Sequence, residues 1–212
     1  MTKTGADFMT TLFTQKSLVQ QIKKAIKAKG SDVFIITHHK GQYQITDSHF
    51  MVNVPSSYMD NDHDLKAEIT KIFGGIPEEN SGYRLNKGAK NVQKIEQDQA
   101  ARFYDIMHEG LSKTKTHCTF TGLKFDKQYK NIVNRLITVN IFQSAGNYIY
   151  IDSSLLECVN LFSATIEADN TSGTKYPALY ITESPESEFS FMVLPIRVES
   201  GDHEALSYLK EL

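Results

Sequence analysis

The residues best suited to bind a ligand form a lysine-rich stretch near the start of the chain. Five lysines and no acidic residue lie between Lys16 and Lys29. Lys16, Lys23 and Lys27 recur at intervals that place them on one face of a helix, and Lys24 flanks that face. Most surface helices mix charges to gain ion pairs, so a face of one sign favours contact with a polyanion such as DNA. The alternative interpretation is a solvated lysine-rich face without a partner.

A second basic stretch lies in the middle of the chain. From Lys113 to Arg135 there are six lysines and arginines and one acidic residue. Three of these lysines are predicted to form a second DNA-binding patch: Lys124, Lys127 and Lys130. By contrast, residues 152–212 hold eleven acidic residues and three basic ones. Charge is therefore segregated along the chain, which favours local anion binding despite a formal net charge of −2.

Catalytic residue types occur side by side in one short segment, Asp47-Ser48-His49. Neighbouring residues of an extended chain point to opposite faces, so adjacency cannot build a triad, and we expect a turn here. The histidines His38, His39 and His49 could converge across a hairpin, but they lack the fixed spacing typical of a zinc site. We therefore predict no catalytic residue and no bound metal.

The first acidic cluster and the cysteines favour structural roles. Asp60, Asp62 and Asp64 resemble the start of a calcium loop, but the glycine and the final glutamate of such a loop are missing. We expect these aspartates to stabilise the positive end of a helix instead. Cys118 and Cys158 lie in apolar surroundings and belong to no C-x-x-C pair, so they are expected to be buried thiols.

Composition indicates a soluble, cytoplasmic protein of one domain. The chain has 212 residues, of which 40% are hydrophobic, enough to bury a core. It contains no apolar run near the roughly 18 residues that span a bilayer. The first residues lack a basic start followed by an apolar stretch, so no signal peptide is expected.

Hydrophobic periodicity predicts the α+β class. Helices are expected over Lys16–Lys29, Asp64–Phe73, Val92–Leu111 and Ser153–Phe162. Strands are expected over Val33–Thr37, Gln42–Thr46, Phe50–Val54, His117–Phe125, Arg135–Phe142, Tyr148–Ile151, Thr165–Glu167, Pro177–Thr182 and Phe189–Val198. A loop is expected from Gly74 to Ala89, and a short amphipathic segment over His203–Leu212.

Three short segments recur in the same order in the two halves of the chain. The pairs are Ser17-Leu18 with Ser154-Leu155, Ile45-Thr46 with Ile181-Thr182, and Phe50-Met51-Val52 with Phe191-Met192-Val193. The order helix, hairpin, hydrophobic strand predicts an internal duplication within a single domain of residues 1–212. The expected units are residues 8–112, with inserted helices, and residues 113–212. Two unrelated helix-plus-meander segments remain the alternative.

The second unit carries a resemblance to a known family. The residues concerned are Asp152–Leu156 after a strand, Pro177–Ile181 as a penultimate strand, and Phe191–Val198, which is similar to a Met-Pro-x-Arg-Leu ending. These segments resemble the last domain of the DNA sliding clamps, in particular the bacterial DNA polymerase III beta subunit. Leu194 stands where that family has Met, and Val198 stands where it has Leu.

The resemblance implies a DNA-clamp-like fold of duplicated helix-plus-antiparallel-strand units with two inserted helices. It implies a divergent relative from a phage or mobile element, without enzymatic activity or cofactor. The partner would be duplex DNA or a replication protein, with no membrane association. A bacterial clamp subunit has three such domains, whereas this chain has room for one, so we expect a monomer or dimer rather than a ring.

Two other functions stay open from the sequence. The first is a protein-binding accessory or inhibitor module without DNA affinity, which would use an exposed sheet edge or the amphipathic tail His203–Leu212. The second is a small hydrolase or transferase that uses His49 or His117.

Overall fold

The computed structural model describes residues 18–27, 32–113, 115–129, 135–169, 177–184 and 187–196. The helices within these residues are α1 (Leu18–Lys27), α2 (Ser56–Asn61), α3 (His63–Phe73) and α4 (Gln97–Ser112), with a 3-10 turn η1 (Ser153–Leu155). The strands of the first half are β1 (Val33–His39), β2 (Gln42–Thr46), β3 (Phe50–Pro55), β4 (Ser81–Asn86) and β5 (Asn91–Ile95). Those of the second half are β6 (Lys115–His117), β7 (Thr119–Tyr129), β8 (Arg135–Ser144), β9 (Asn147–Asp152), β10 (Thr165–Asp169), β11 (Leu179–Thr182) and β12 (Ser190–Val193).

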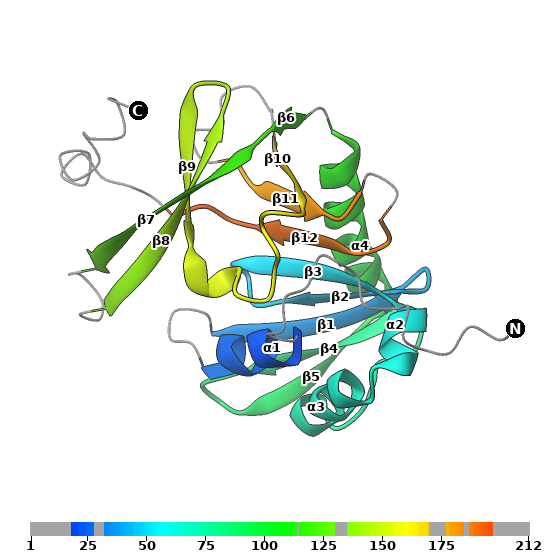
Figure 1. Ribbon diagram of the computed structural model, residues 1–212. Helices are drawn as coiled ribbons and strands as arrows, with labels where there is room; N and C mark the ends of the chain where they lie inside the picture. The colour runs from blue at the N-terminus through cyan, green and yellow to red at the C-terminus, as the bar shows by residue number, and fades with distance from the viewer. Residues whose placement is uncertain are drawn as a thin grey trace, which may run out of the picture.

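A large antiparallel sheet forms the centre of the molecule (Figure 1). Its nine strands follow the order β5-β4-β1-β2-β3-β12-β11-β10-β6. A small sheet of three strands, β7-β8-β9, stands beside it. The predicted α+β class is therefore confirmed, with antiparallel pairing throughout both sheets.

Two three-stranded meanders meet at the middle of the large sheet. The meander β1-β2-β3 comes from the first half of the chain, and β10-β11-β12 comes from the second. Their third strands pair so that Met51 lies opposite Met192, with Phe50 opposite Val193 on one side and Val52 opposite Phe191 on the other. The pairing is thus symmetric about Met51 and Met192. Superposition of complete units, and with it the clamp-like duplication, stays a prediction.

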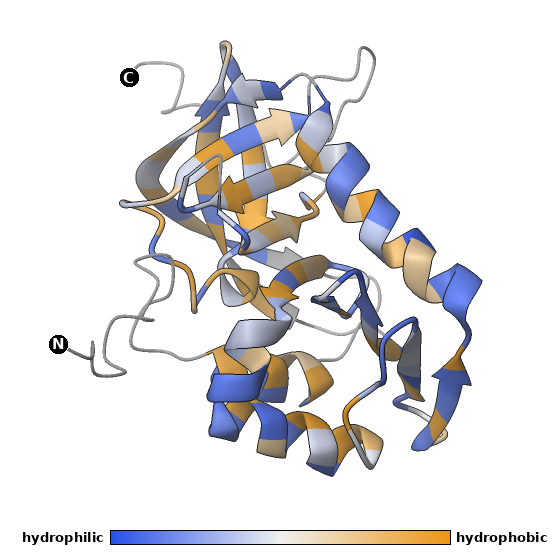
Figure 2. Ribbon diagram, turned by 90° about the vertical axis from the view of Figure 1, so that its right-hand side faces the viewer, coloured by the Kyte–Doolittle hydropathy of each residue, from blue (hydrophilic) through white to orange (hydrophobic). Residues whose placement is uncertain are grey.

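The main core lies on one face of the large sheet. Strand residues such as Phe34, Ile36 and Phe191 point into it, and α1 and α3 cover them. The segment that follows η1 and part of the small sheet complete this layer. In the hydropathy view, orange hydrophobic residues are interspersed with blue hydrophilic ones along the helices and strands (Figure 2). Helix α4 covers part of the opposite face, where Met51 and Met107 are buried.

Helix α1 forms where the sequence predicts it within the described residues. Leu18, Ile22 and Ala25 recur at helical spacing and are buried against the core. The Lys87 ammonium group donates a hydrogen bond to the carbonyl of Ala25, 2.6 Å away, so it satisfies one of the last free carbonyl groups of the helix. Lys16 lies outside the described residues.

The region predicted as a loop and a long helix is different. Residues 81–95 form the β4–β5 hairpin, and α4 begins at Gln97 rather than at Val92. A four-residue turn reverses the chain after Asn86, whose side-chain amide donates a hydrogen bond to Asn91 at 3.1 Å. The insertion therefore contains α2, α3, a hairpin and α4, instead of two helices.

The predicted helix Ser153–Phe162 is also wrong. Only η1 is helical, and its start is capped by Asp152, whose carboxylate accepts a hydrogen bond from the Ser154 amide at 2.9 Å. After it the chain forms separate tight turns, in which the Leu156 and Val159 amides bond to carbonyl groups three residues earlier. These turns bury Leu156, Cys158 and Val159 while Phe162 remains 84% exposed.

None of the helices in the described residues has the length and apolar character needed to span a bilayer.

Candidate functional site

The lysines of α1 lie on its exposed side, but two of them have acidic partners. The Lys23 ammonium lies 3.4 Å from the carboxylate of Glu68 on α3. Lys24 forms an ion pair with Glu157, in the turn that follows η1. Lys27 is exposed at the end of the helix. The face predicted to be basic therefore carries two surface ion pairs. Ion pairs between exposed side chains are weak, typically below about 1 kcal/mol.

The second predicted patch is not a single exposed surface. Lys124 and Lys127 both belong to β7, where Lys124 is exposed but Lys127 is only 6% exposed. Lys130 lies outside the described residues, as does Lys16. Seven lysines are predicted to bind DNA. Of these, Lys27 and Lys124 are exposed and form no ion pair with another described residue.

The segment Asp47-Ser48-His49 forms the turn that the sequence predicts. The buried Asp47 carboxylate accepts hydrogen bonds from the backbone amides of His49, at 2.9 Å, and of Phe50, at 3.2 Å. The Ser48 hydroxyl donates to the Asp47 carbonyl rather than to the histidine. The carboxylate thus holds the turn between β2 and β3, and the three side chains have no relay geometry.

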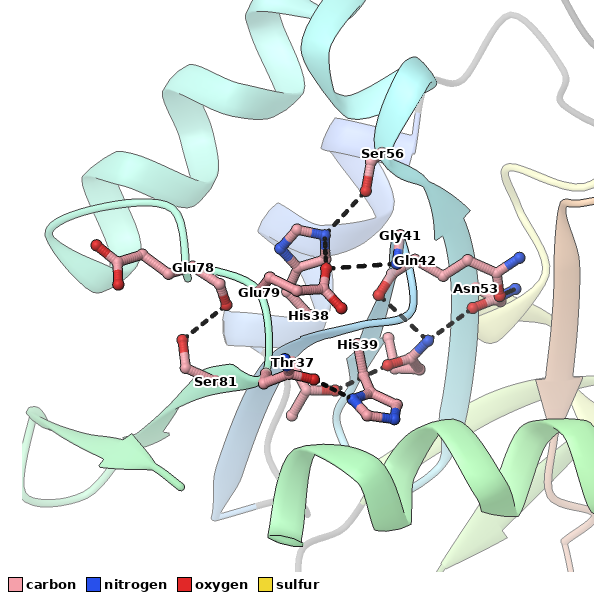
Figure 3. Close-up of polar contacts among 12 residues, drawn as sticks. Thr37, His38, His39, Gly41, Gln42, Asn53, Ser56, Glu78, Glu79 and Ser81 are labelled. Carbon is pink, nitrogen blue, oxygen red and sulfur yellow. Dashed lines mark hydrogen bonds and ion pairs between the residues drawn. The ribbon is translucent and has the colours of Figure 1, made fainter. Parts of the chain in front are cut away.

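A cluster of polar side chains missed by the sequence reasoning lies at the β1–β2 hairpin (Figure 3). Nε2 of His38 lies 2.9 Å from the Ser56 hydroxyl and 2.9 Å from a carboxylate oxygen of Glu79. The ring of Tyr43 stacks on His38 with 4.0 Å between centroids. Burial, with smaller contributions from Asp60 and Glu79, raises the pKa of Tyr43 to about 12.

A serine, a histidine and a carboxylate in contact invite comparison with a hydrolase site. In a triad the histidine uses one ring nitrogen for the nucleophile and the other for the acid. Here Ser56 and Glu79 share Nε2 of His38, while Nδ1 is buried and has no hydrogen-bond partner among the described residues. The cluster therefore joins the hairpin, α2 and the loop before β4, and it lacks the geometry of proton relay.

His39 points to the other side of β1, toward α4 (Figure 3). Its Nδ1 lies 2.6 Å from the side-chain oxygen of Asn80, and its ring meets the edge of Tyr104 on α4. Tyr104 also stacks on His108 and receives the Lys40 ammonium 4.8 Å above its ring. Because His38 and His39 face opposite sides of the sheet, the histidines do not converge on a metal site.

The aspartates before α3 have separate structural roles. The Asp62 side chain caps α3 by accepting a hydrogen bond from the Leu65 amide at 2.9 Å, as the sequence predicts. Asp60 lies in α2 and pairs with Lys66 at 3.6 Å. Asp64 falls in the first turn of α3. The described residues contain no cluster of His, Cys, Asp or Glu that could bind a metal ion.

A row of polar residues crosses the large sheet on the face that carries α4. The cross-strand neighbours are, in order, Thr37, Gln44, Asn53, Ser190, Thr182 and Thr165. Within this row Thr37 donates to Gln44 at 3.0 Å, and Gln44 donates to Asn53 at 2.9 Å. Asn53 in turn donates to the Gln42 side chain at 2.6 Å. These buried amides fix strand register, because a shift of one strand would leave them without partners.

A groove of about 260 Å³ lies between α4 and the β5 end of the large sheet. Its floor is formed by Ile35, Arg84 and Ile95, and its wall by Gln99, Arg102, Phe103 and Ile106. The four wall residues follow one face of α4. The lining is therefore apolar with two cations and no carboxylate, and Ile106 is 40% exposed.

The edge strand β5 borders this groove. Within the part of the chain that the structure describes, β5 pairs only with β4, so its other side carries unpaired backbone groups. Four of its five residues are exposed, including Val92 at 39%. At the opposite edge β6 has only three residues. The β5 edge together with the groove, called the β5 surface below, is a candidate recognition surface of the described residues.

Both cysteines are buried thiols, as the sequence predicts. Burial raises the pKa of Cys118, and it raises the pKa of Cys158 to about 12. Neither thiol is therefore activated as a nucleophile.

The β5 surface was missed because its parts are far apart in the sequence. Arg84, Ile95 and Ile106 acquire a common role only through the β4–β5 hairpin, and the sequence signal for that hairpin was the Lys87-Gly88 turn flanked by Asn86 and Asn91. No protein-family model, curated protein or solved structure matches this chain. The clamp-like relationship therefore stays a prediction.

Proposed function

We propose that the chain is a non-catalytic protein-binding module that adds a strand of its partner to the β5 edge. The observation that carries this proposal is the β5 surface, where an unpaired strand edge adjoins an apolar groove. A partner strand at this edge gains backbone hydrogen bonds, and its side chains gain burial in the groove. The proposal develops the accessory-module alternative that the sequence left open.

Strand addition predicts a specific protection pattern. The test is to select peptides from a displayed random library on the whole protein and to measure hydrogen–deuterium exchange with and without a selected peptide. Backbone amides of residues 91–95 should become protected on binding, whereas those of β6 at the other edge should not. Selected peptides that leave exchange at residues 91–95 unchanged would contradict the proposal.

A matched pair of variants distinguishes peptide binding in the groove from nonspecific binding to exposed apolar residues. Ile106→Glu places a charge in the groove, and Leu194→Glu makes the same change at a residue of similar exposure, 42% against 40%. Ile106→Glu should weaken peptide binding at least about ten-fold through loss of apolar contact and burial of charge. Leu194→Glu should bind like the unmodified protein, and equal losses in both variants would count against the groove.

A second candidate function is binding of the duplex DNA backbone, as a replisome-associated clamp-like protein. The observation that favours it is the position of Lys23, Lys24 and Lys27 on the exposed side of α1. The acidic partners of the first two reduce the charge of this face. Any contact with phosphate would therefore exchange one weak ion pair for another.

The DNA candidate has its own test. About four phosphate contacts would give a slope of log affinity against log salt of roughly −3 to −4. The triple variant Lys23→Gln, Lys24→Gln, Lys27→Gln should abolish this binding. Its thermal stability should change little, because the three residues are exposed and glutamine places no like charge beside Glu68 or Glu157. Absence of DNA binding at low salt would exclude the second candidate and leave the first unaffected.

A further inference from the structure

We infer that the β5 surface selects an extended peptide segment in which an acidic side chain and an apolar side chain lie two residues apart. The inference rests on the proposed function and assigns the chemistry of the partner strand. It follows from the register of the large sheet and from the charges of the groove.

The register defines which partner side chains enter the groove. Ile35, Arg84 and Gln93 lie opposite one another on adjacent strands, so all three point toward α4. Ile95 lies two residues after Gln93 and points to the same face. A partner strand beside β5 therefore directs one side chain over Gln93 and another, two residues away, over Ile95.

The apolar position is the one beside Ile95. That residue is 3% exposed and packs with Ala100, while Phe103 and Ile106 continue the apolar wall along α4. A leucine-like side chain at this place would remove the exposed part of Ile106 from water. A charged side chain would lose hydration there without gaining a partner.

The acidic position is the one beside Gln93. Arg84 lies one strand further in, about 10 Å from a partner backbone at two strand spacings, and a glutamate and an arginine side chain together span that distance. Arg102 lines the same groove from α4. Both guanidinium groups are on exposed residues, and no carboxylate lines the groove. Two arginines around one site favour a carboxylate, which each can bind through two parallel hydrogen bonds.

The other side of β5 agrees with this preference. Val92 and Lys94 point away from α4, and Lys94 is the only charged residue of the strand. Glu96 and Asp98 follow at the start of α4, but neither lines the groove. The charges that a partner strand meets along β5 are therefore positive. Nucleic acid lacks both the strand backbone and the apolar anchor that this surface accommodates, which is why a peptide is the favoured class.

The test uses four fluorescein-labelled peptides of about ten residues, rich in threonine to favour an extended conformation. The first carries leucine and glutamate two residues apart. The second replaces glutamate by glutamine, the third replaces it by lysine, and the fourth keeps the first composition with a central proline. Anisotropy gives the dissociation constants, and hydrogen–deuterium exchange at residues 91–95 reports strand addition.

The glutamate peptide should bind best, the glutamine peptide about ten-fold more weakly, and the lysine and proline peptides not measurably. The variant Arg84→Gln, Arg102→Gln should bind the glutamate peptide about ten-fold more weakly and the glutamine peptide unchanged. Lys71→Gln, Lys124→Gln removes the same two charges at exposed positions on α3 and β7, so it is the control for net charge and should bind like the unmodified protein.

The outcomes distinguish failure of the inferred peptide chemistry from failure of the proposed strand addition. Equal affinity for the glutamate and glutamine peptides, with residues 91–95 protected by both, would overturn the inference and leave the proposed function standing. An equal loss of affinity for the glutamate and glutamine peptides in the arginine variant would also overturn it, because the arginines would then contribute to binding without contacting the carboxylate. No protection at residues 91–95 with any peptide would overturn both.

Discussion

The rings of Phe50 and Phe191 stack across the junction between β3 and β12, with centroids 5.4 Å apart and planes 11° apart. Both side chains are buried, at 1% and 0% exposure. The two strands belong to different meanders, so this contact joins the two halves of the large sheet at its centre.

The stacked pair should behave as one energetic unit. Replacing either phenylalanine by leucine keeps most of the volume and should cost about 1 kcal/mol of unfolding free energy. The double variant should lose less than the sum by about 0.5–1.5 kcal/mol, since the aromatic contact can be lost only once. Urea unfolding of the four proteins in this cycle measures the coupling. Losses that simply add would show that the rings are independent.

Gly110 should be a required residue of α4. An added Cβ there would lie 2.1 Å from the Tyr180 hydroxyl and 2.5 Å from the ring carbon that bears it. Helix propensity alone would make Gly110→Ala stabilising by about 1 kcal/mol, so a destabilised variant reveals the contact. Thermal unfolding should show a lower Tm for Gly110→Ala. The same substitution should lower the Tm less, or raise it, in a Tyr180→Ala background, whose own Tm is reduced by the loss of a buried ring. A stabilised single variant would mean that α4 does not pack closely on β11.

The thiols of Cys118 and Cys158 should be unreactive in the folded protein. Burial raises the pKa of Cys158 to about 12, so very little of this thiol is ionised at pH 8. Labelling by a disulfide reagent should be at least about a hundred-fold slower in buffer than in denaturant. The single variants Cys118→Ala and Cys158→Ala assign the labelling phases. Rapid reaction of either thiol under native conditions would contradict its burial.

Stability should fall in alkali because folding raises the pKa of two tyrosine side chains. Burial raises the pKa of Tyr43 and of Tyr58 to about 12, with the charges of Asp60 and Asp62 as the next contributions. A folded pKa above the unfolded value of 10 means that the stabilisation is complete below pH 10 and is lost as the pH rises toward 12. The double variant Tyr43→Phe, Tyr58→Phe should therefore show a weaker decrease in unfolding free energy over this range. If the double variant loses as much unfolding free energy between pH 10 and pH 12 as the unmodified protein, other groups cause the loss of stability in alkali.

Local patterns predicted the elements whose residues determine their own conformation. The apolar spacing of Leu18 and Ile22 identifies α1, and the alternation around Ile36 and Ile45 identifies two strands of the large sheet. The turn at Asp47 follows from its carboxylate. These features depend on neighbours within a few residues, which is the range that periodicity and turn chemistry describe.

The remaining features depend on distant partners. Val92 belongs to a strand because β4 pairs with it, although its surroundings also match a helical pattern. Leu156 and Val159 enter the core from separate turns, which periodicity reads as one helix. Lys24 approaches Glu157 only in the folded protein. The positive charge predicted for the lysine face was therefore higher than the charge of that face in the structure. The β5 surface has no local signature, because strands and a helix each contribute part of it.

The junction of β3 and β12 also sets an order of events during synthesis. β12 spans residues 190–193, so β3 must leave the ribosome long before its partner exists. Throughout that interval the Phe50–Pro55 segment offers a hydrophobic strand with an unpaired edge, the kind of segment that aggregates or recruits chaperones. Contacts of such long sequence separation also slow folding. The centre of the finished sheet is thus completed only after residues 190–193 have been made, and until then the nascent chain exposes a strand that is buried along its whole length in the native protein.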